Sequence, residues 1–123
     1  MKKSILGLRT TVYKVPDLAK AKDWYKKAFE TAPYFDEPFY VGFSVGGFEL
    51  GLLPEGKGDA EADNVIAYWG VEDIQGRYDH FIQCGATEHE KPNNVGGELM
   101  VASVRDPWGN VIGLIYNPDF RIE

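Results

Sequence analysis

Two segments of this chain recur further along it in the same order. Residues 15–18 (VPDL), which lead into a helix-like stretch, correspond to residues 71–74 (VEDI). Residues 47–52 (GFELGL) correspond in the same way to residues 109–114 (GNVIGL). Such a repeat indicates one supersecondary unit present in two copies. The chain is therefore expected to fold as two similar modules that build one cleft from two halves.

Length and composition fit one folded domain. The chain has 123 residues, of which 44% are hydrophobic and 14% aromatic, and domains usually run to about 100 to 200 residues. We predict a single domain over residues 1–123, with module one at about residues 5–56 and module two at about residues 63–118. The polar stretch 54–63 is expected to link the modules.

In module one, the pattern predicts a strand, a helix and then further strands. Residues 8–15 are rich in β-branched and aromatic residues and end at Pro16. Asp17 is a good N-cap for the helix that follows. Gly46 and Gly47 have the chemistry of a tight hairpin turn. Further strands are predicted over residues 34–37, 39–45 and 48–53.

Module two repeats this order. A strand over residues 64–71 precedes a helix over 73–84, which Gly85 caps. The segment 86–98 has no decisive motif and is expected to be a loop. Turns at 96–97 and 106–110 (DPWGN) delimit the remaining strands, which are predicted over residues 98–105 and 110–116.

Alternation along the strands assigns side chains to faces. One face carries Phe48, Leu50 and Leu52 in module one. It matches Ile112, Leu114 and Tyr116 in module two, and these six apolar residues are expected under the helices. The opposite face then carries Glu49 and Gly51 in module one and Gly113 in module two. Glycine in mid-strand is unfavourable by about 0.5–1 kcal/mol relative to alanine. Close approach of a ligand or of another backbone, or a bend of a barrel, would explain it.

These motifs resemble the βαβββ units of the vicinal oxygen chelate superfamily, which includes glyoxalase I, extradiol dioxygenases and bleomycin-resistance proteins. The resemblance covers nearly the whole chain, and residues 106–114 (DPWGNVIGL) are its most specific part. It implies an α+β fold of two βαβββ modules. The modules would form a concave, partly closed mixed or antiparallel sheet with the helices on its outer face. The resemblance also implies a homodimer.

The metal-dependent members of that family hold a divalent ion with His, Glu or Gln side chains. The resemblance carries those positions onto Thr10, Gly51, Ile66 and Gly113. Glycine and isoleucine offer no donor side chain, so we predict no metal and no cofactor. His80 is expected to pack or to lie on the helix surface, and His89 to be solvated.

Glu49 shares its face with Gly51, and we expect Tyr68 to be its companion. A carboxylate and a phenol in an apolar hollow can hold a cation or act as base and acid. The alternative is a rim glutamate in water and a tyrosine that only packs. Trp108, in a turn, is expected to contact a ligand or a second subunit, or to be partly exposed.

We predict a metal-independent protein that sequesters an aromatic or cationic small molecule in its cleft. The alternatives are a glyoxalase-like lyase or dioxygenase, with a divalent metal at an unidentified site, and a metal-free acid–base enzyme that uses Glu49 and Tyr68. The predicted ligand-binding residues are Thr10, Glu49, Gly51, Ile66, Tyr68, Trp108 and Gly113.

Charge and cysteine content narrow the partners and the compartment. A net charge of −6 and a pI near 4.9 disfavour nucleic acid. No apolar run approaches the length of a membrane span, and the lone Cys84 has no internal disulfide partner. We expect a cytoplasmic homodimer that binds neither nucleic acid nor membranes.

Overall fold

The computed structural model describes residue 4 and residues 8–56 and 65–119. Its residues divide into two compact units on either side of residues 57–64, and each unit is described by itself. Most of the predicted linker over 54–63 lies outside the described residues, as does the first residue of the strand predicted over 64–71.

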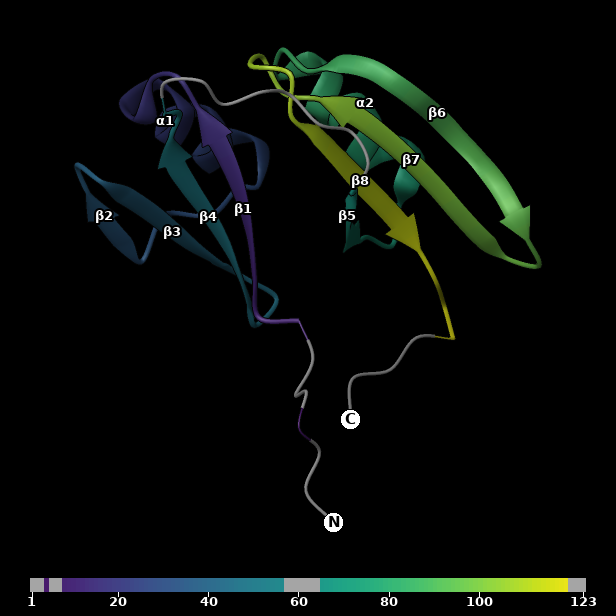
Figure 1. The fold of residues 1–123 in the computed structure, drawn as a ribbon. Helices are drawn as coiled ribbons and strands as arrows, with labels where there is room; N and C mark the ends of the chain where they lie inside the picture. Colours follow the sequence, from purple (N-terminus) through teal and green to yellow (C-terminus); the bar gives the residue numbers. More distant parts are fainter. Residues whose placement is uncertain (1–3, 5–7, 57–64, 120–123) are drawn as a thin grey trace. The chain divides into compact units, whose positions relative to one another are not determined.

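Module one is a four-stranded mixed sheet with one helix (Figure 1). Its elements are β1 (Thr10–Val15), α1 (Leu18–Ala28), β2 (Phe35–Glu37), β3 (Tyr40–Val45) and β4 (Phe48–Pro54). The strand order is β1-β4-β3-β2, with β1 parallel to β4 and the other pairs antiparallel. This βαβββ unit confirms the strands and the helix predicted for the module.

The first helix begins and packs as its sequence predicts. The Asp17 side chain accepts a hydrogen bond of 3.2 Å from the backbone N–H of Lys20, which makes Asp17 the N-cap. Tyr25 of α1 is fully buried and stacks on Tyr13 of β1 at a ring separation of 5.7 Å. Tyr13 pairs in register with Leu52, so α1 covers the sheet face that buries Leu52.

A two-glycine turn sets the register of the β3–β4 hairpin. Gly46 and Gly47 have φ of 58° and 89°, the left-handed conformation that a two-residue hairpin needs and glycine adopts readily. Val45 therefore pairs with Phe48, and Gly42 pairs with Gly51 further along the ladder. The turn thus places two glycines opposite each other on the face away from α1.

Module two has the same order of elements (Figure 1). These are β5 (Ala67–Gly70), α2 (Ile74–Gln83), β6 (Thr87–Gly96), β7 (Leu99–Arg105) and β8 (Val111–Tyr116). The strand order is β5-β8-β7-β6, with β5 parallel to β8. Two four-stranded mixed sheets with one helix each confirm the α+β class and the paired βαβββ modules.

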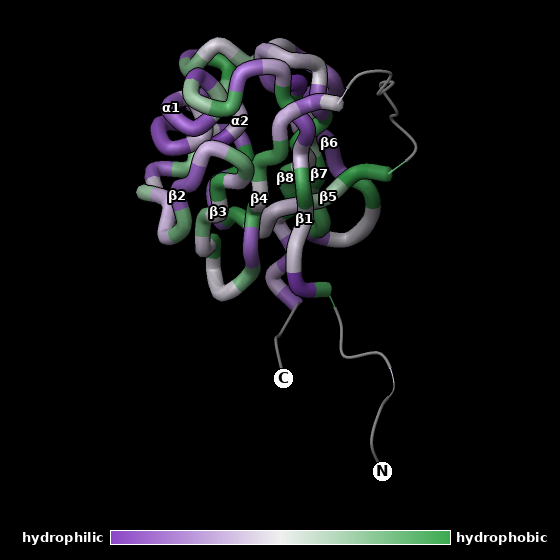
Figure 2. Tube along the Cα trace, turned by 60° about the vertical axis from the view of Figure 1, so that its left-hand side comes forward, coloured by the Kyte–Doolittle hydropathy of each residue, from purple (hydrophilic) through white to green (hydrophobic). Residues whose placement is uncertain are grey.

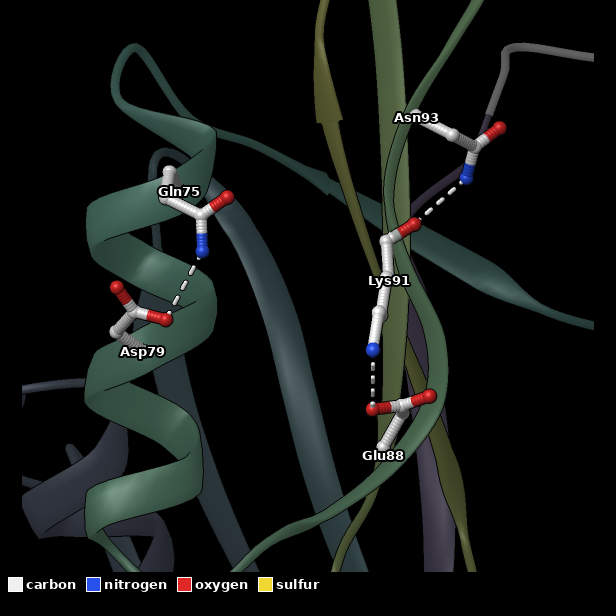
Figure 3. Close-up of polar contacts among 5 residues, drawn as sticks. All are labelled: Gln75, Asp79, Glu88, Lys91 and Asn93. Carbon is white, nitrogen blue, oxygen red and sulfur yellow. Dashed lines mark hydrogen bonds and ion pairs between the residues drawn. The ribbon is translucent and has the colours of Figure 1, made fainter.

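The prediction of a loop over residues 86–98 is wrong, because most of this segment forms the ten-residue strand β6. The strand is exposed over most of its length and pairs with β7 through several register shifts. Its surface contacts are polar: Lys91 Nζ lies 4.0 Å from Glu88 Oε1, and Asn93 donates a 2.7 Å hydrogen bond to the Lys91 carbonyl (Figure 3). An edge strand of this kind has no apolar alternation for a pattern to detect.

The turn predicted at 106–110 is present and is held by a buried carboxylate. Asp106 is 3% exposed and accepts hydrogen bonds from the backbone N–H groups of Trp108 and Asn110 at 2.9 and 2.8 Å. Gly109 has a φ of 95°. This turn joins β7 to β8 and places Gly113 in the middle of its sheet.

Alternate apolar residues of β4 and β8 are fully buried. Leu50, Leu52, Ile112 and Leu114 are at most 1% exposed, which confirms their predicted burial. Phe48 and Tyr116, predicted on the same face, are only half-buried. Figure 2 shows hydrophobic and hydrophilic residues mixed along the strands. Of the helices within residues 8–56 and 65–119, neither has the length and apolar character needed to cross a membrane.

Replacing Gly47 by alanine is expected to destabilise module one. At a φ of 89° an L-residue costs about 1–2 kcal/mol, so the denaturant midpoint should fall. Gly70→Ala is the matched control, because an added Cβ at Gly70 meets nothing within 4 Å and its φ is not positive. Equal midpoints for the two variants, measured by urea unfolding, would contradict the assigned turn.

Candidate functional site

The face of the module-one sheet away from α1 carries a carboxylate in a defined position. Glu49 lies on β4, and its register partner on the neighbouring strand β1 is Thr10. The Thr10 hydroxyl donates a 2.9 Å hydrogen bond to Glu49 Oε1. The structure therefore brings together two of the residues predicted to bind a ligand.

Two tyrosines also form hydrogen bonds with this carboxylate. The Tyr34 hydroxyl donates a short hydrogen bond to Glu49 Oε2, and Tyr40 of β3 is also hydrogen-bonded to Glu49. Three hydroxyls from three separate segments thus converge on one side chain. We call Thr10, Tyr34, Tyr40 and Glu49 the Glu49 cluster.

Paired glycines make room for the cluster. A Cβ added at Gly51 would overlap the Tyr40 hydroxyl, and one added at Gly42 would lie 2.7 Å from Glu49 Oε2. Any side chain at either position would displace the phenol or the carboxylate. The space predicted at Gly51 is therefore filled by the phenol of Tyr40.

Hydrogen bonding determines the charge of the cluster. The hydrogen bond from Tyr34, together with those from Thr10 and Tyr40, lowers the pKa of Glu49 against an opposing contribution from burial. Burial and the nearby Glu49 charge raise the pKa of Tyr40 to about 12. At neutral pH the carboxylate is therefore ionised and the Tyr40 phenol is neutral.

The lowered pKa has two consequences. A carboxylate with a depressed pKa is a weak base, which disfavours the acid–base role considered for Glu49. The stability that its ionised form contributes is present above its unfolded pKa, and is lost as the pH falls through its lower folded pKa. Glu49 therefore acts as a fixed negative charge.

Exposed aromatic rings lie beside this charge. The rings of Phe35 and Tyr40 are 6.0 Å apart, and those of Phe35 and Phe39 are 6.1 Å apart in an edge-on arrangement. Tyr34 is 64% exposed, Phe39 63% and Phe35 38%. We call Tyr34, Phe35 and Phe39 the aromatic rim. The arrangement can offer an anion and π-faces to a ligand.

Module two carries the other predicted site residues, without a carboxylate at the corresponding register position. Tyr68 pairs with Gly113, and a Cβ at Gly113 would lie 2.6 Å from Tyr68 Cδ1. Ile66 directly precedes β5, and Trp108 is half-buried in the β7–β8 turn. Tyr68, predicted as the companion of Glu49, packs on its own module's glycine.

The histidines and the cysteine have local partners. His89 is exposed, as expected, and its Nδ1 also lies 2.7 Å from the hydroxyl of the buried Ser103. His80 Nε2 lies 3.7 Å from Cys84 Sγ, one turn along α2, in keeping with a role on the helix. On the same helix, Gln75 donates a 3.0 Å hydrogen bond to Asp79 (Figure 3).

The four positions that the resemblance links to a metal do not fit a divalent ion. The Thr10 hydroxyl donates to Glu49, and tyrosine side chains occupy the space at Gly51 and Gly113. Among the described residues, no three His, Cys, Asp or Glu side chains gather in a way that could hold an ion. Metal independence stays a prediction.

The sequence pattern missed Tyr34, Tyr40 and Gly42. The two-residue turn contained a signal for two of them, because pairing Val45 with Phe48 puts Gly42 opposite Gly51. Tyr40, two residues before Gly42, then falls on the same face. Tyr34 precedes its strand, where no period assigns a face.

Comparison with known proteins agrees with the two-module architecture. A family model described as "Glyoxalase/Bleomycin resistance protein/Dioxygenase superfamily" matches residues 7–114. The chain belongs to this superfamily. A search of curated protein sequences with this chain found no match.

Solved structures of superfamily proteins share the fold. A glyoxalase-related enzyme from Fulvimarina pelagi is similar with a TM-score of 0.78 and 18% identity, over 97% of this chain and 94% of that one. Lactoylglutathione lyase from Agrobacterium tumefaciens is similar with a TM-score of 0.75 and 18% identity, over 96% and 100%. At these identities the likeness extends to the fold alone.

Replacing Gly51 by alanine is expected to expel the Tyr40 phenol from the Glu49 cluster. Gly51 is not at positive φ, so the strand accepts alanine, while the added Cβ takes the place of the hydroxyl. The pKa of Tyr40 should then fall from about 12 towards the ordinary value of about 10. NMR titration of ¹³C-labelled tyrosine rings, assigned with Tyr40→Phe, measures this. An unchanged Tyr40 titration would show that its phenol does not occupy the Gly51 site.

Proposed function

We propose that this protein binds a small aromatic compound that carries a positive charge, without a metal, at the Glu49 cluster. The observation that carries the proposal is an ionised carboxylate held in place beside exposed aromatic rings. Hydroxyls anchor Glu49 from three segments, so the anion is already positioned before a ligand arrives.

The charge of the cluster supports a cationic ligand. Among the described residues, the groups that donate hydrogen bonds to the Glu49 carboxylate are neutral hydroxyls, which do not cancel its negative charge. The net charge of −6 adds a field that attracts cations. The rings of the aromatic rim are 38–64% exposed, which leaves their faces available for cation–π contacts worth about 0.5–2 kcal/mol.

The weak basicity of Glu49 favours binding over catalysis by this residue. The family includes enzymes, but the fold by itself does not specify a reaction. Homodimer formation and a cytoplasmic location stay predictions.

Binding of phenyltrimethylammonium to the wild-type protein, measured by calorimetry in the presence of EDTA, tests the proposal. Benzoate has a similar ring and the opposite charge, and is expected not to bind. Glu49→Gln should weaken binding of the cation by about tenfold or more, because it removes a charge interaction of about 1.4 kcal/mol or more.

Glu55→Gln is the matched control. It removes the same charge immediately after β4, about 20 Å along the strand from Glu49, and should leave the affinity unchanged. Equal losses in the two variants would indicate only a general charge effect. Binding that requires an added divalent ion would also contradict the proposal.

A further inference from the structure

The phenol of Tyr40 occupies a site with the features of a ligand pocket. Its floor is the glycine pair Gly42 and Gly51, which face each other on β3 and β4. At one end, Glu49 accepts its hydrogen bond. The ring of Tyr34 approaches the Gly42 edge, where an added Cβ would lie 3.2 Å from Tyr34 Cε1. We call this space the phenol socket.

The socket does not depend on Tyr40 for its shape. The ladder between β3 and β4 fixes the two glycines, and Thr10 and Tyr34 hold Glu49 independently. Tyr40 is the first residue of β3 and follows the turn at 38–39. Rotation about its side-chain torsions would therefore remove the phenol without breaking a backbone hydrogen bond.

We infer that the Tyr40 side chain occupies the site of a ligand. When this side chain rotates away, the phenol socket accepts the hydroxyaryl group of a small molecule. This inference rests on the proposed function, because it assigns the aromatic part of the ligand to the same site. The chemical class is a neutral phenol whose hydroxyl donates to Glu49.

The carboxylate makes the socket selective for a neutral donor. A ring without a hydroxyl would leave a Glu49 oxygen without its partner, at a cost of about 1–3 kcal/mol. A phenol that ionises would bring a second negative charge to the carboxylate and be repelled. 4-Methylphenol should therefore bind, whereas toluene and ionised 4-nitrophenol should not.

Tyr40→Ala empties the socket and allows the test. This variant should bind 4-methylphenol at least about tenfold more tightly than the wild-type protein does, and about tenfold more tightly than it binds toluene. The double variant Tyr40→Ala/Gly51→Ala refills the floor with a methyl group and should lose this binding. Affinities come from NMR titration of backbone amides in module one.

A folded Tyr40→Ala protein that does not bind 4-methylphenol, or that binds toluene equally well, would overturn the inference. Equal binding by the Gly51→Ala double variant would do so too. If Tyr40→Ala does not fold, the wild-type protein gives the answer. Excess 4-methylphenol should move the ¹³C-labelled Tyr40 ring signal to its exposed position, and an unmoved signal would contradict the socket.

The two proposals fail in different ways. Glu49-dependent binding of phenyltrimethylammonium by the wild-type protein, with no 4-methylphenol binding by Tyr40→Ala, would refute only the phenol socket. Binding of 4-methylphenol by Tyr40→Ala, with no cation binding by the wild-type protein, would refute only the cationic ligand.

Discussion

The ionised carboxylate of Glu49 organises the face of module one that its helix leaves uncovered. Thr10 reaches it from β1, Tyr40 from β3 and Tyr34 from the segment before β2. Each contact satisfies a polar group on the sheet and fixes the orientation of a side chain. Without this acceptor, the two phenols would lose their common partner and the glycine floor would lose its occupant.

Both modules have the same contact between a mid-strand glycine and a tyrosine, but the neighbouring residues differ. In each, a mid-strand glycine accommodates a tyrosine ring from the same module: Tyr40 at Gly51 and Tyr68 at Gly113. The register partners differ, however. In module one the partner of Gly51 on β3 is Gly42, whereas in module two the partner of Gly113 on β7 is Ser103, which contacts His89. The two modules therefore share the framework but differ in the residues that surround the glycine.

The sequence predicted the fold well because its signals are local. Asp17 and Asp73 cap the two helices. Gly46 and Gly47 form one two-residue turn, and Gly97 begins the other, at residues 97–98. Strand β6 escaped prediction because it is a polar edge strand containing Pro92, and its pairing partner rather than its own pattern makes it a strand.

The candidate site was predicted only in part, because local sequence signals do not determine which residues meet in the folded chain. Alternation assigned Glu49 to its face, and Thr10 was also a predicted site residue, but their contact depends on the register of β1 against β4. The position of Tyr40 required the hairpin register, and that of Tyr34 required the path of a segment without periodicity. Residues brought together by tertiary structure leave no spacing in the sequence.

Glu49 is ionised at neutral pH and accepts hydrogen bonds from the hydroxyls of Thr10, Tyr34 and Tyr40. The pH titration of its side-chain carboxyl carbon, followed by ¹³C NMR and assigned with Glu49→Gln, tests this most directly. We expect a midpoint below the ordinary glutamate pKa of about 4.3, and a higher midpoint when Tyr34 is replaced by phenylalanine. A midpoint at or above the ordinary value, unmoved by that replacement, would contradict this arrangement.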